Sequence, residues 1–209
     1  MRILFLAAAL VFAGGLPARA AMPTNSASIV AAARAQIGKT LRYDSSYRAL
    51  DYPNGDVPLE TGVCADVVVR ALRKGLEMDL QSLVHDDMKS DFARYPRIWG
   101  LQGPDKNIDH RRVPNLQVYF KRTGWDLPVS QQSRDYLPGD LVTCTVPPNL
   151  PHIMIVSDRT NTTGRPLVIH NIGAGAQEED RLFDFKLTGH YRVKRGSIPQ
   201  RSRDSVTNQ

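Results

Sequence analysis

Residues 138–158, PGDLVTCTVPPNLPHIMIVSD, contain two runs with the composition of β-strands, separated by a proline-rich turn. The run LVTCTV follows a Pro-Gly-Asp turn, and the run HIMIVSD follows the second turn. A third run of this kind, RPLVIHNIG, spans 165–173 and ends in glycines typical of a tight turn. The second half of the chain is therefore predicted to form neighbouring strands.

Helical patterns precede these strands. The stretch SIVAAARAQIG at 28–38 has an apolar stripe at helical spacing, with Ser26 or Ser28 as N-cap and Gly38 as its end. The other helices are predicted at 65–74, with Gly75 ending it, at 80–92 and at 116–122. Helices first and strands later predict an α+β domain, with N-terminal helices packed on a mostly antiparallel sheet. The long segment 95–115 has few apolar periods, and such a stretch inside a compact domain is usually functional or misassigned.

Both ends of the chain differ from its middle. Residues 1–20 begin with Arg2, continue with an apolar run and end in Ala-Arg-Ala, which predicts a cleaved signal peptide. We expect a single domain over 21–192, followed by a basic, disordered tail over 193–209. The protein is accordingly expected in the periplasm or secreted, with no stable membrane insertion after cleavage. The alternative is an uncleaved N-terminal anchor.

The 209 residues carry a formal net charge of +6, which favours anionic polymers without choosing among them. Export and the lack of any nucleic-acid-binding motif argue against nucleic acid as a partner. No compact zinc motif is present, so neither a metal nor a cofactor is expected. A metal site remains open only as an alternative, with these residues as its ligands: His85, Asp86, Asp87, Asp109 and His110.

Cys64 stands at the head of a predicted helix in the stretch GVCADVVVRALRKG, at 62–75. A thiol is a nucleophile as thiolate, and the unpaired N–H groups of a helix N-terminus stabilise that form. Two other interpretations stay open. One is a disulfide to Cys144, since exported proteins meet an oxidising compartment. The other is an inert buried thiol. Against the disulfide, strand alternation places Cys144 on one face with Val142 and Val146, as a core residue.

A nucleophilic thiol also needs a base and a group that orients this base. His152 opens the strand HIMIVSD, and His170 ends the strand LVIH, so the two rings are predicted to lie near one another at a sheet end. A lone histidine at a strand end is otherwise an ordinary structural residue. Asn171 points to the opposite face of a regular strand and takes the orienting role if His170 faces away.

The helix start at Cys64, together with LPGDLVTC, HIMIVSD and LVIHNIGAG, resembles the NlpC-type branch of the papain-like cysteine hydrolases, which cut peptidoglycan stem peptides. The resemblance implies an NlpC-type papain-like fold, with Cys64 as nucleophile, His152 as general base and His170 as the orienting residue. It also implies a tyrosine near the nucleophile, for which Tyr43 and Tyr47 are candidates. The chain departs from the usual Asp-Cys-Ser-Gly pattern, because Val63 precedes the cysteine and Ala65-Asp66 follow it.

A second resemblance extends over roughly 32–192. The blocks YPNGDVP, GVCADVVVRALR, DLQSLVHDDM, NIDHRRVPNL, PGDLV, HNIG and GHYR are similar to exported bacterial proteins of domain-of-unknown-function family 1287. Membership in a family without an assigned activity implies a fold and a set of residues, and not a substrate.

We expect an exported cysteine hydrolase that cleaves an amide bond in cell-wall peptides. The predicted substrate-binding residues are Tyr43, Asp66, His110, Arg111 and Asn171. Arginines suit the carboxylates of a stem peptide, and the alternative for His110 and Arg111 is a salt-bridged surface or a network that fixes the loop. Asp66 is expected to cap its helix or to pair with an arginine of DHRRV. The alternative function is a non-catalytic cell-wall-binding or envelope-assembly protein that retains the fold.

Overall fold

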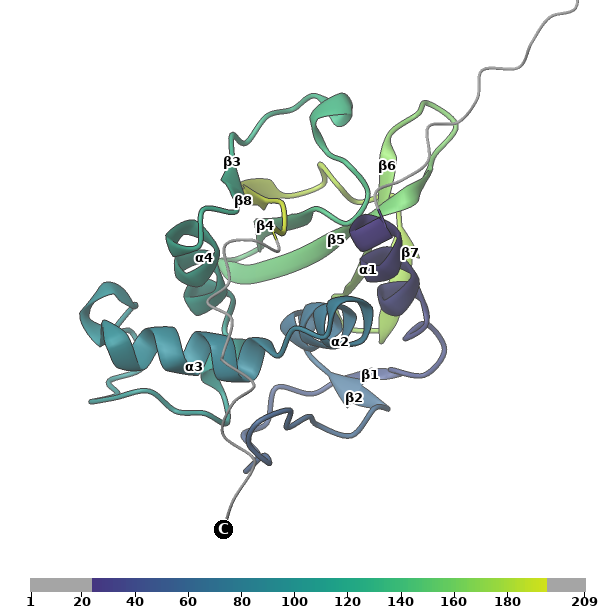
Figure 1. Cartoon of the computed structure of the whole chain (residues 1–209). Coiled ribbons are helices and arrows are strands. Elements are labelled where there is room, and N and C mark those ends of the chain that lie inside the picture. Colours follow the sequence, from purple (N-terminus) through teal and green to yellow (C-terminus); the bar gives the residue numbers. More distant parts are fainter. Residues whose placement is uncertain (1–23, 195–209) are drawn as a thin grey trace, which may run out of the picture.

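The computed structural model describes residues 24–194, which form four α-helices and two sheets (Figure 1). The predicted signal peptide and the tail beyond residue 194 lie outside the described residues. In chain order the elements are α1 Thr24–Arg34, β1 Arg42–Tyr43, β2 Thr61–Gly62, α2 Cys64–Leu76, α3 Leu80–Ser90, α4 Val113–Arg122, β3 Asp126–Leu127, β4 Leu141–Val146, β5 Leu150–Thr160, β6 Pro166–Asn171, β7 Ala176–Glu179 and β8 Lys186–Tyr191.

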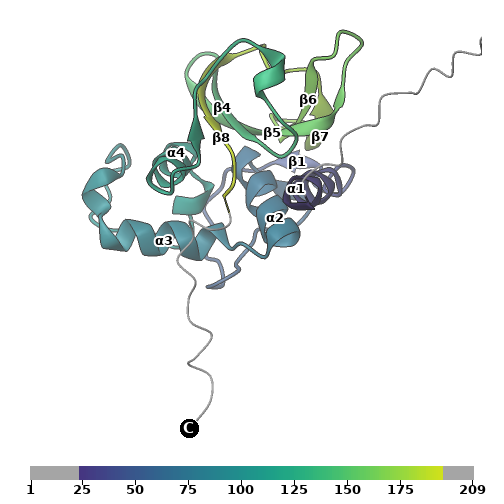
Figure 2. The same ribbon diagram turned by 45° about the horizontal axis from the view of Figure 1, so that its top comes forward.

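The larger sheet is antiparallel throughout its six strands, in the order β3-β8-β4-β5-β6-β7. The hairpin of β4 and β5 lies at its centre, with Leu141 opposite Ile155 and Val146 opposite Leu150. Figure 2 shows this sheet curving over α1 and α2. The predicted α+β class, with helices packed on an antiparallel sheet, is therefore confirmed.

Each face of the sheet is buried in its own apolar cluster. Ile153, Ile155 and Ile169 face α1 and α2 in one cluster, together with Cys64. Cys144 belongs to the cluster on the other face, with Val142 and other alternate strand residues. Cys144 is 1% exposed, so its predicted place in the core is confirmed. Alternation along β4 thus separates the environments of the two cysteines.

Helices α1 and α2 pack very closely, and Gly75 is where they meet. A Cβ built on Gly75 would lie 2.7 Å from the main-chain oxygen of Ser28, so only glycine fits there. The prediction that Gly75 ends the helix is wrong, because α2 continues to Leu76 and ends in a left-handed Glu77. Ser26 and Ser28 likewise lie inside α1 rather than capping it. Tertiary packing, and not helix termination, explains this glycine.

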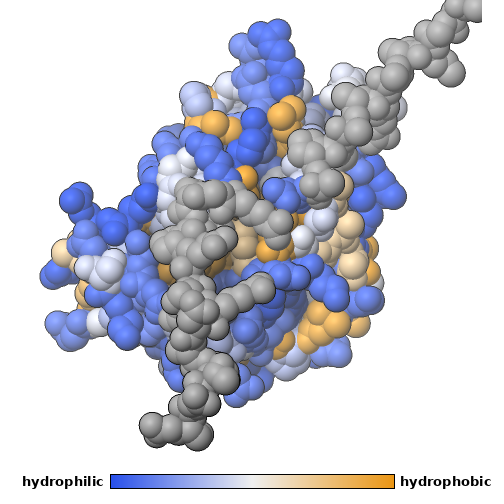
Figure 3. All heavy atoms as spheres, in the orientation of Figure 1, coloured by the Kyte–Doolittle hydropathy of each residue, from blue (hydrophilic) through white to orange (hydrophobic). Residues whose placement is uncertain are grey.

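The segment 95–115 is mostly irregular, with a short 3-10 turn at Asp109–Arg111. Helix α4 begins at Val113, three residues before the predicted start, because Pro114 suits the first turn of a helix. On the face seen in Figure 3, hydrophilic residues predominate and hydrophobic residues form small separate patches. Between residues 24 and 194, no helix has the length and apolar character needed to cross a bilayer.

Candidate active site

Cys64 is the first residue of α2 and is 3% exposed. Val63 before it is extended, and its main-chain N–H donates to Asp66 Oδ2 at 2.6 Å, which closes the first turn of the helix. The main-chain N–H groups of Ile153, Ala65 and Cys64 itself act on the sulfur, and all three lower the pKa of the thiol. The thiol therefore lies between the N-terminus of α2 and the start of β5.

Burial nevertheless dominates the ionisation of this thiol. It raises the pKa of Cys64 to about 11, and the nearby charge of Asp66 adds to the rise, while the N–H groups oppose it. A charge in an apolar surrounding loses its hydration, and here the helix terminus does not make up for that loss. The N–H groups of the helix start lower the pKa of the thiol as expected, but burial outweighs them and favours the neutral form of Cys64.

The two predicted histidines meet across β5 and β6. His152 Nε2 lies 2.8 Å from His170 Nδ1, and His170 Nε2 lies 3.0 Å from Glu179 Oε2 on β7. His170 is fully buried and His152 almost so. Burial lowers the pKa of His152 to about 3, with the positive charge of His170 as a further cause. The pKa of His170 is also lowered by burial, against the attraction of Glu179. Burial thus favours the neutral form of both rings.

The histidine pair approaches Cys64 through the main chain. Ile153, whose N–H acts on the sulfur, directly follows His152. Within residues 24–194, no hydrogen bond joins the His152 ring to the thiol. His152 is paired with Cys144, whereas Ile153 belongs to the apolar cluster of Cys64. Strand alternation therefore places the rings of His152 and His170 on the sheet face of Cys144, opposite the face that packs on Cys64.

Asn171 faces away from the histidine pair, as strand alternation predicts. Its side-chain amide donates to the main-chain oxygen of Gly62 at 2.9 Å, and its oxygen accepts from the N–H of Gly173 at 3.1 Å. Gly62 lies two residues before Cys64, so Asn171 ties the end of β6 to the segment that leads into α2. Its role in substrate binding stays a prediction.

Asp66 and Arg111 form a buried ion pair next to Cys64. Arg111 Nε and Nη2 donate to the two carboxylate oxygens of Asp66 at 2.9 and 3.0 Å. Arg111 also donates to the main-chain oxygens of Asp44 and Ser46 at 3.2 and 3.3 Å. The prediction that Asp66 caps its helix or pairs with an arginine of DHRRV is confirmed, and Asp66 makes both contacts. The two charges neutralise one another, and the pair holds the loop after β1 against α2. Its contact with substrate stays a prediction.

His110 is 2% exposed, and it is not among the residues that line the pocket at Cys64. Burial lowers its pKa to about 4, and the nearby charges that affect it are those of Arg111, Asp79, Arg73 and Asp56. In the described part of the chain, no three metal-ligating side chains gather into a possible metal site. The segment around His110 therefore supports the pocket wall from behind.

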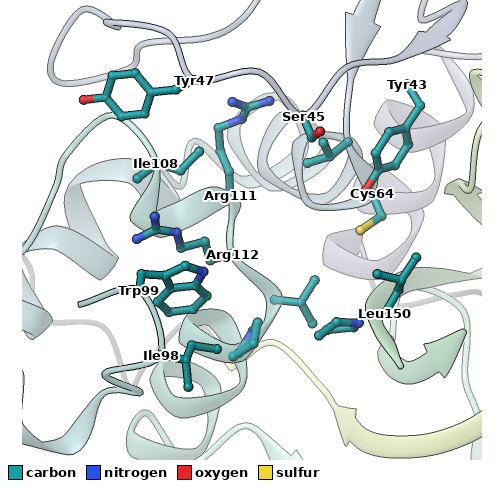
Figure 4. A pocket seen from close by; sticks show the side chains of 14 residues that line it. Tyr43, Ser45, Tyr47, Cys64, Ile98, Trp99, Ile108, Arg111, Arg112 and Leu150 are labelled. Atoms are coloured by element: carbon teal, nitrogen blue, oxygen red, sulfur yellow. The ribbon is translucent and has the colours of Figure 1, made fainter. Parts of the chain in front are cut away.

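A pocket of about 540 Å³ opens at Cys64 (Figure 4). Tyr43 points its hydroxyl toward the cysteine, which places one of the two candidate tyrosines beside the thiol. Burial raises the pKa of Tyr43 to about 12, and the charge that Cys64 would carry as thiolate adds to this. The pocket is lined by Tyr43, Ser45, Tyr47, Val63, Cys64, Ile98, Trp99, Ile108, Arg111, Arg112, Val113, Pro114, Leu150 and Pro151.

Among these residues the sequence analysis named Tyr43, Tyr47, Cys64 and Arg111 as candidates, and most of the others, including Ile98, Trp99 and Leu150, were missed. The guanidinium of Arg112 stacks on the Trp99 ring, with its carbon 4.2 Å from the ring centroid, and its Nη1 pairs with Asp109 at 3.1 Å. The one signal in the sequence was the length of the irregular segment 95–115, within which Ile98 and Trp99 lie. The pocket is rich in apolar and aromatic side chains, and none of the described residues that line it carries a carboxylate.

The fold is an α+β domain in which a buried cysteine begins a helix, and this helix packs against an antiparallel sheet that carries a hydrogen-bonded histidine pair. The chain belongs to the family described as Domain of unknown function (DUF1287), which matches residues 30–193. It is 56% identical over 169 residues to a protein of Escherichia coli (strain K12) described as uncharacterized protein YijF, covering 81% of this chain and 82% of that one.

Proposed function

We propose that this protein is a cysteine hydrolase of the NlpC-type papain-like fold, which cleaves an amide bond in peptidoglycan stem peptides. The observation that carries the proposal is the position of Cys64 at the first turn of α2 and in a pocket, where the main-chain N–H groups of Ile153, Ala65 and Cys64 act on its sulfur. Nucleophile, base and orienting group are the three roles that thiol catalysis needs.

The ionisation of the site favours a reaction that starts from a neutral pair. As the sulfur attacks the carbonyl carbon, the S–H bond breaks and its proton passes to His152. The Cys64 main-chain N–H helps to hold the resulting oxyanion. His152 then protonates the leaving amine, and afterwards it takes a proton from the water that hydrolyses the thioester. In the free protein the His152 ring lies on the sheet face of Cys144, so this proton transfer requires the ring to reach the thiol around the strand end when substrate binds.

The pocket supports a peptide as substrate. Its aromatic and apolar walls offer contact area, and the Arg112 guanidinium on Trp99 supplies a positive edge, suited to a substrate carboxylate. Cleavage of cell-wall peptides agrees with the predicted signal peptide, and we place the protein in the periplasm or outside the cell. Peptidoglycan or its fragments are the partner in this proposal.

The test uses peptidoglycan fragments released by a muramidase and analysed by mass spectrometry. We expect wild type to split a fragment into two products whose masses add up to the parent plus one water, and the bond is identified from these masses. Cys64→Ala is expected to lose this activity, since no other group replaces the sulfur.

Cys144→Ser is the matched control, because Cys144 is a buried free thiol on the other sheet face. It is expected to cleave like wild type. Equal cleavage by Cys64→Ala and wild type would rule out the proposed nucleophile. Binding of the fragments without cleavage by wild type would instead favour the non-catalytic wall-binding alternative.

A further inference from the structure

We propose that Arg112 binds a free carboxylate of the substrate across the pocket from Cys64, so that the protein discriminates between wall peptides with free and with amidated carboxyl groups. The inference deepens the proposed function and rests on it. In Figure 4, Arg112 and Trp99 lie on one side of the pocket, and Cys64 and Tyr43 lie on the other. The carboxylate therefore belongs to a part of the peptide next to the bond that Cys64 attacks.

Two consecutive arginines line the pocket, and they differ in the hydrogen-bond donors that they leave free. Arg111 donates to both carboxylate oxygens of Asp66 and to two main-chain oxygens, and its side chain is 2% exposed. Arg112 has a side chain that is 18% exposed, and its Nη1 donates to Asp109 Oδ1 at 3.1 Å. In the part of the chain that the structure describes, the N–H groups at Nε and Nη2 of Arg112 have no partner. Arg112, and not Arg111, can therefore donate to a ligand.

The guanidinium of Arg112 is held in place from two sides. Its carbon lies 4.2 Å from the centroid of the Trp99 ring, and Asp109 accepts from its Nη1. Asp109 also accepts from the N–H of Asp105 and from the side-chain amide of Asn115, so its oxygens are shared among three donors. An arginine that is already fixed loses little side-chain entropy when it binds an anion.

The free edge of the guanidinium matches a carboxylate. Nε and Nη2 lie on the same edge, and such a planar pair of donors binds the two oxygens of a carboxylate in parallel. None of the described residues that line the pocket carries a carboxylate of its own to occupy this edge. A carboxamide has no charge, and its NH2 group would present a donor to the donors of Arg112. The site is therefore expected to reject an amidated substrate.

The experiment compares muramidase-released peptidoglycan fragments before and after their carboxyl groups are amidated with carbodiimide and ammonia. Wild type is expected to cleave the untreated fragments with a kcat/KM about 10–100 times higher, which is the range of charge-assisted hydrogen bonds. Arg112→Gln is expected to lose a similar factor on untreated fragments and to cleave the two pools equally. A purely structural role of Arg112 would instead lower both rates and leave the preference unchanged.

Arg112→Lys serves where the glutamine variant does not fold, because lysine keeps a positive charge next to Asp109. It lacks the parallel pair of donors, so its preference is expected to fall to a few-fold. Arg94→Gln is the matched control, since it also removes one positive charge and Arg94 is not among the residues that line the pocket. This control should keep the wild-type preference.

Calorimetry with Cys64→Ala, and with Arg112→Gln in the Cys64→Ala background, measures binding of the two pools without cleavage. Weaker binding of the amidated pool to Cys64→Ala, with no difference in the double variant, is expected. Equal binding of the two pools to Cys64→Ala, no binding of either pool, or a preference kept in the folded Arg112 variants would overturn the inference. Failure of the proposed function has a different signature: wild type would leave both pools intact, or Cys64→Ala would cleave as well as wild type.

Discussion

Asp66 binds two groups at once, the main-chain N–H of Val63 and the guanidinium of Arg111. Through Arg111 it therefore connects the helix start that carries Cys64 to the loop that follows Tyr43. The sequence predicted this pairing from charge and proximity to a helix start. It also predicted the contact of His170 with His152, which the structure confirms at 2.8 Å. It did not predict the neutral thiol, because burial depends on residues far away in the chain.

Replacing Asp66 by asparagine is expected to lower the free energy of unfolding by about 3–5 kcal/mol, since Arg111 would remain buried without its counter-ion. Both side chains of the pair are at most 3% exposed. Urea denaturation of wild type and Asp66→Asn measures the loss. Arg94→Gln is the control: Arg94 is 72% exposed in its pair with Asp91, so its loss is expected to cost less than about 1 kcal/mol. A loss below that value for Asp66→Asn would show that the pair does not hold the loop.

At the scale of elements, the helices and the strands β4, β5 and β6 were predictable from local pattern. Strands β7 and β8 were not: AQEE is short and polar, and KLTGHY has few apolar side chains. Both strands form because they pair with other strands of the sheet, and the local sequence pattern does not show such pairing. The consequence for the site is direct, because the missed strand β7 carries Glu179.

At this scale, the close approach of α1 and α2 can be tested with a substitution of Gly75. Gly75→Ala would by helix propensity stabilise α2 by about 1 kcal/mol. We expect instead a net destabilisation of about 1–3 kcal/mol, because the added carbon would lie 2.7 Å from the Ser28 oxygen and force the helices apart. Thermal and urea denaturation measure the change.

Gly103→Ala is the matched control, since nothing lies within 4 Å of a Cβ at that position. Its effect is expected to stay within about 0.5 kcal/mol. A Gly75→Ala protein more stable than wild type would mean that helix propensity, and not contact with α1, determines this position.

At the scale of the whole molecule, the pocket is assembled from separate stretches of chain, around residues 43–47, 63–64, 98–99, 108–114 and 150–151. The sequence identified the reactive residue types in several of these stretches. It did not show that Trp99 and Leu150 line the same pocket as Cys64, because only the folded sheet and the loop after α3 bring them there. Chemistry was thus easier to predict than the shape of the pocket.

The buried neutral histidines are expected to make the whole fold sensitive to acid. The pKa of His110 is about 4 in the folded protein, below its usual value near 6.5, so the unfolded chain binds a proton first as pH falls. Stability is therefore complete above about pH 6.5 and is lost toward pH 4, by about 3 kcal/mol for this residue. His152 and His170 act in the same direction.

Urea denaturation between pH 7 and pH 4 measures this dependence for wild type and His110→Gln. The variant lacks the titrating ring, so its stability should fall less steeply with acid than that of wild type. Equal slopes for the two proteins, or a wild type that gains stability on acidification, would contradict the assignment of a neutral, buried His110.

The central claim, that Cys64 attacks the substrate, is tested most directly by trapping the covalent intermediate. Wild type is mixed with muramidase-released peptidoglycan fragments, quenched in acid within the first turnovers, and analysed by intact-protein and peptide mass spectrometry. The account predicts a mass increase equal to the acyl half of the cleaved fragment, located on Cys64, retained in Cys144→Ser and absent from Cys64→Ala. Cleavage with the adduct on another residue, or undiminished cleavage by Cys64→Ala, would contradict it.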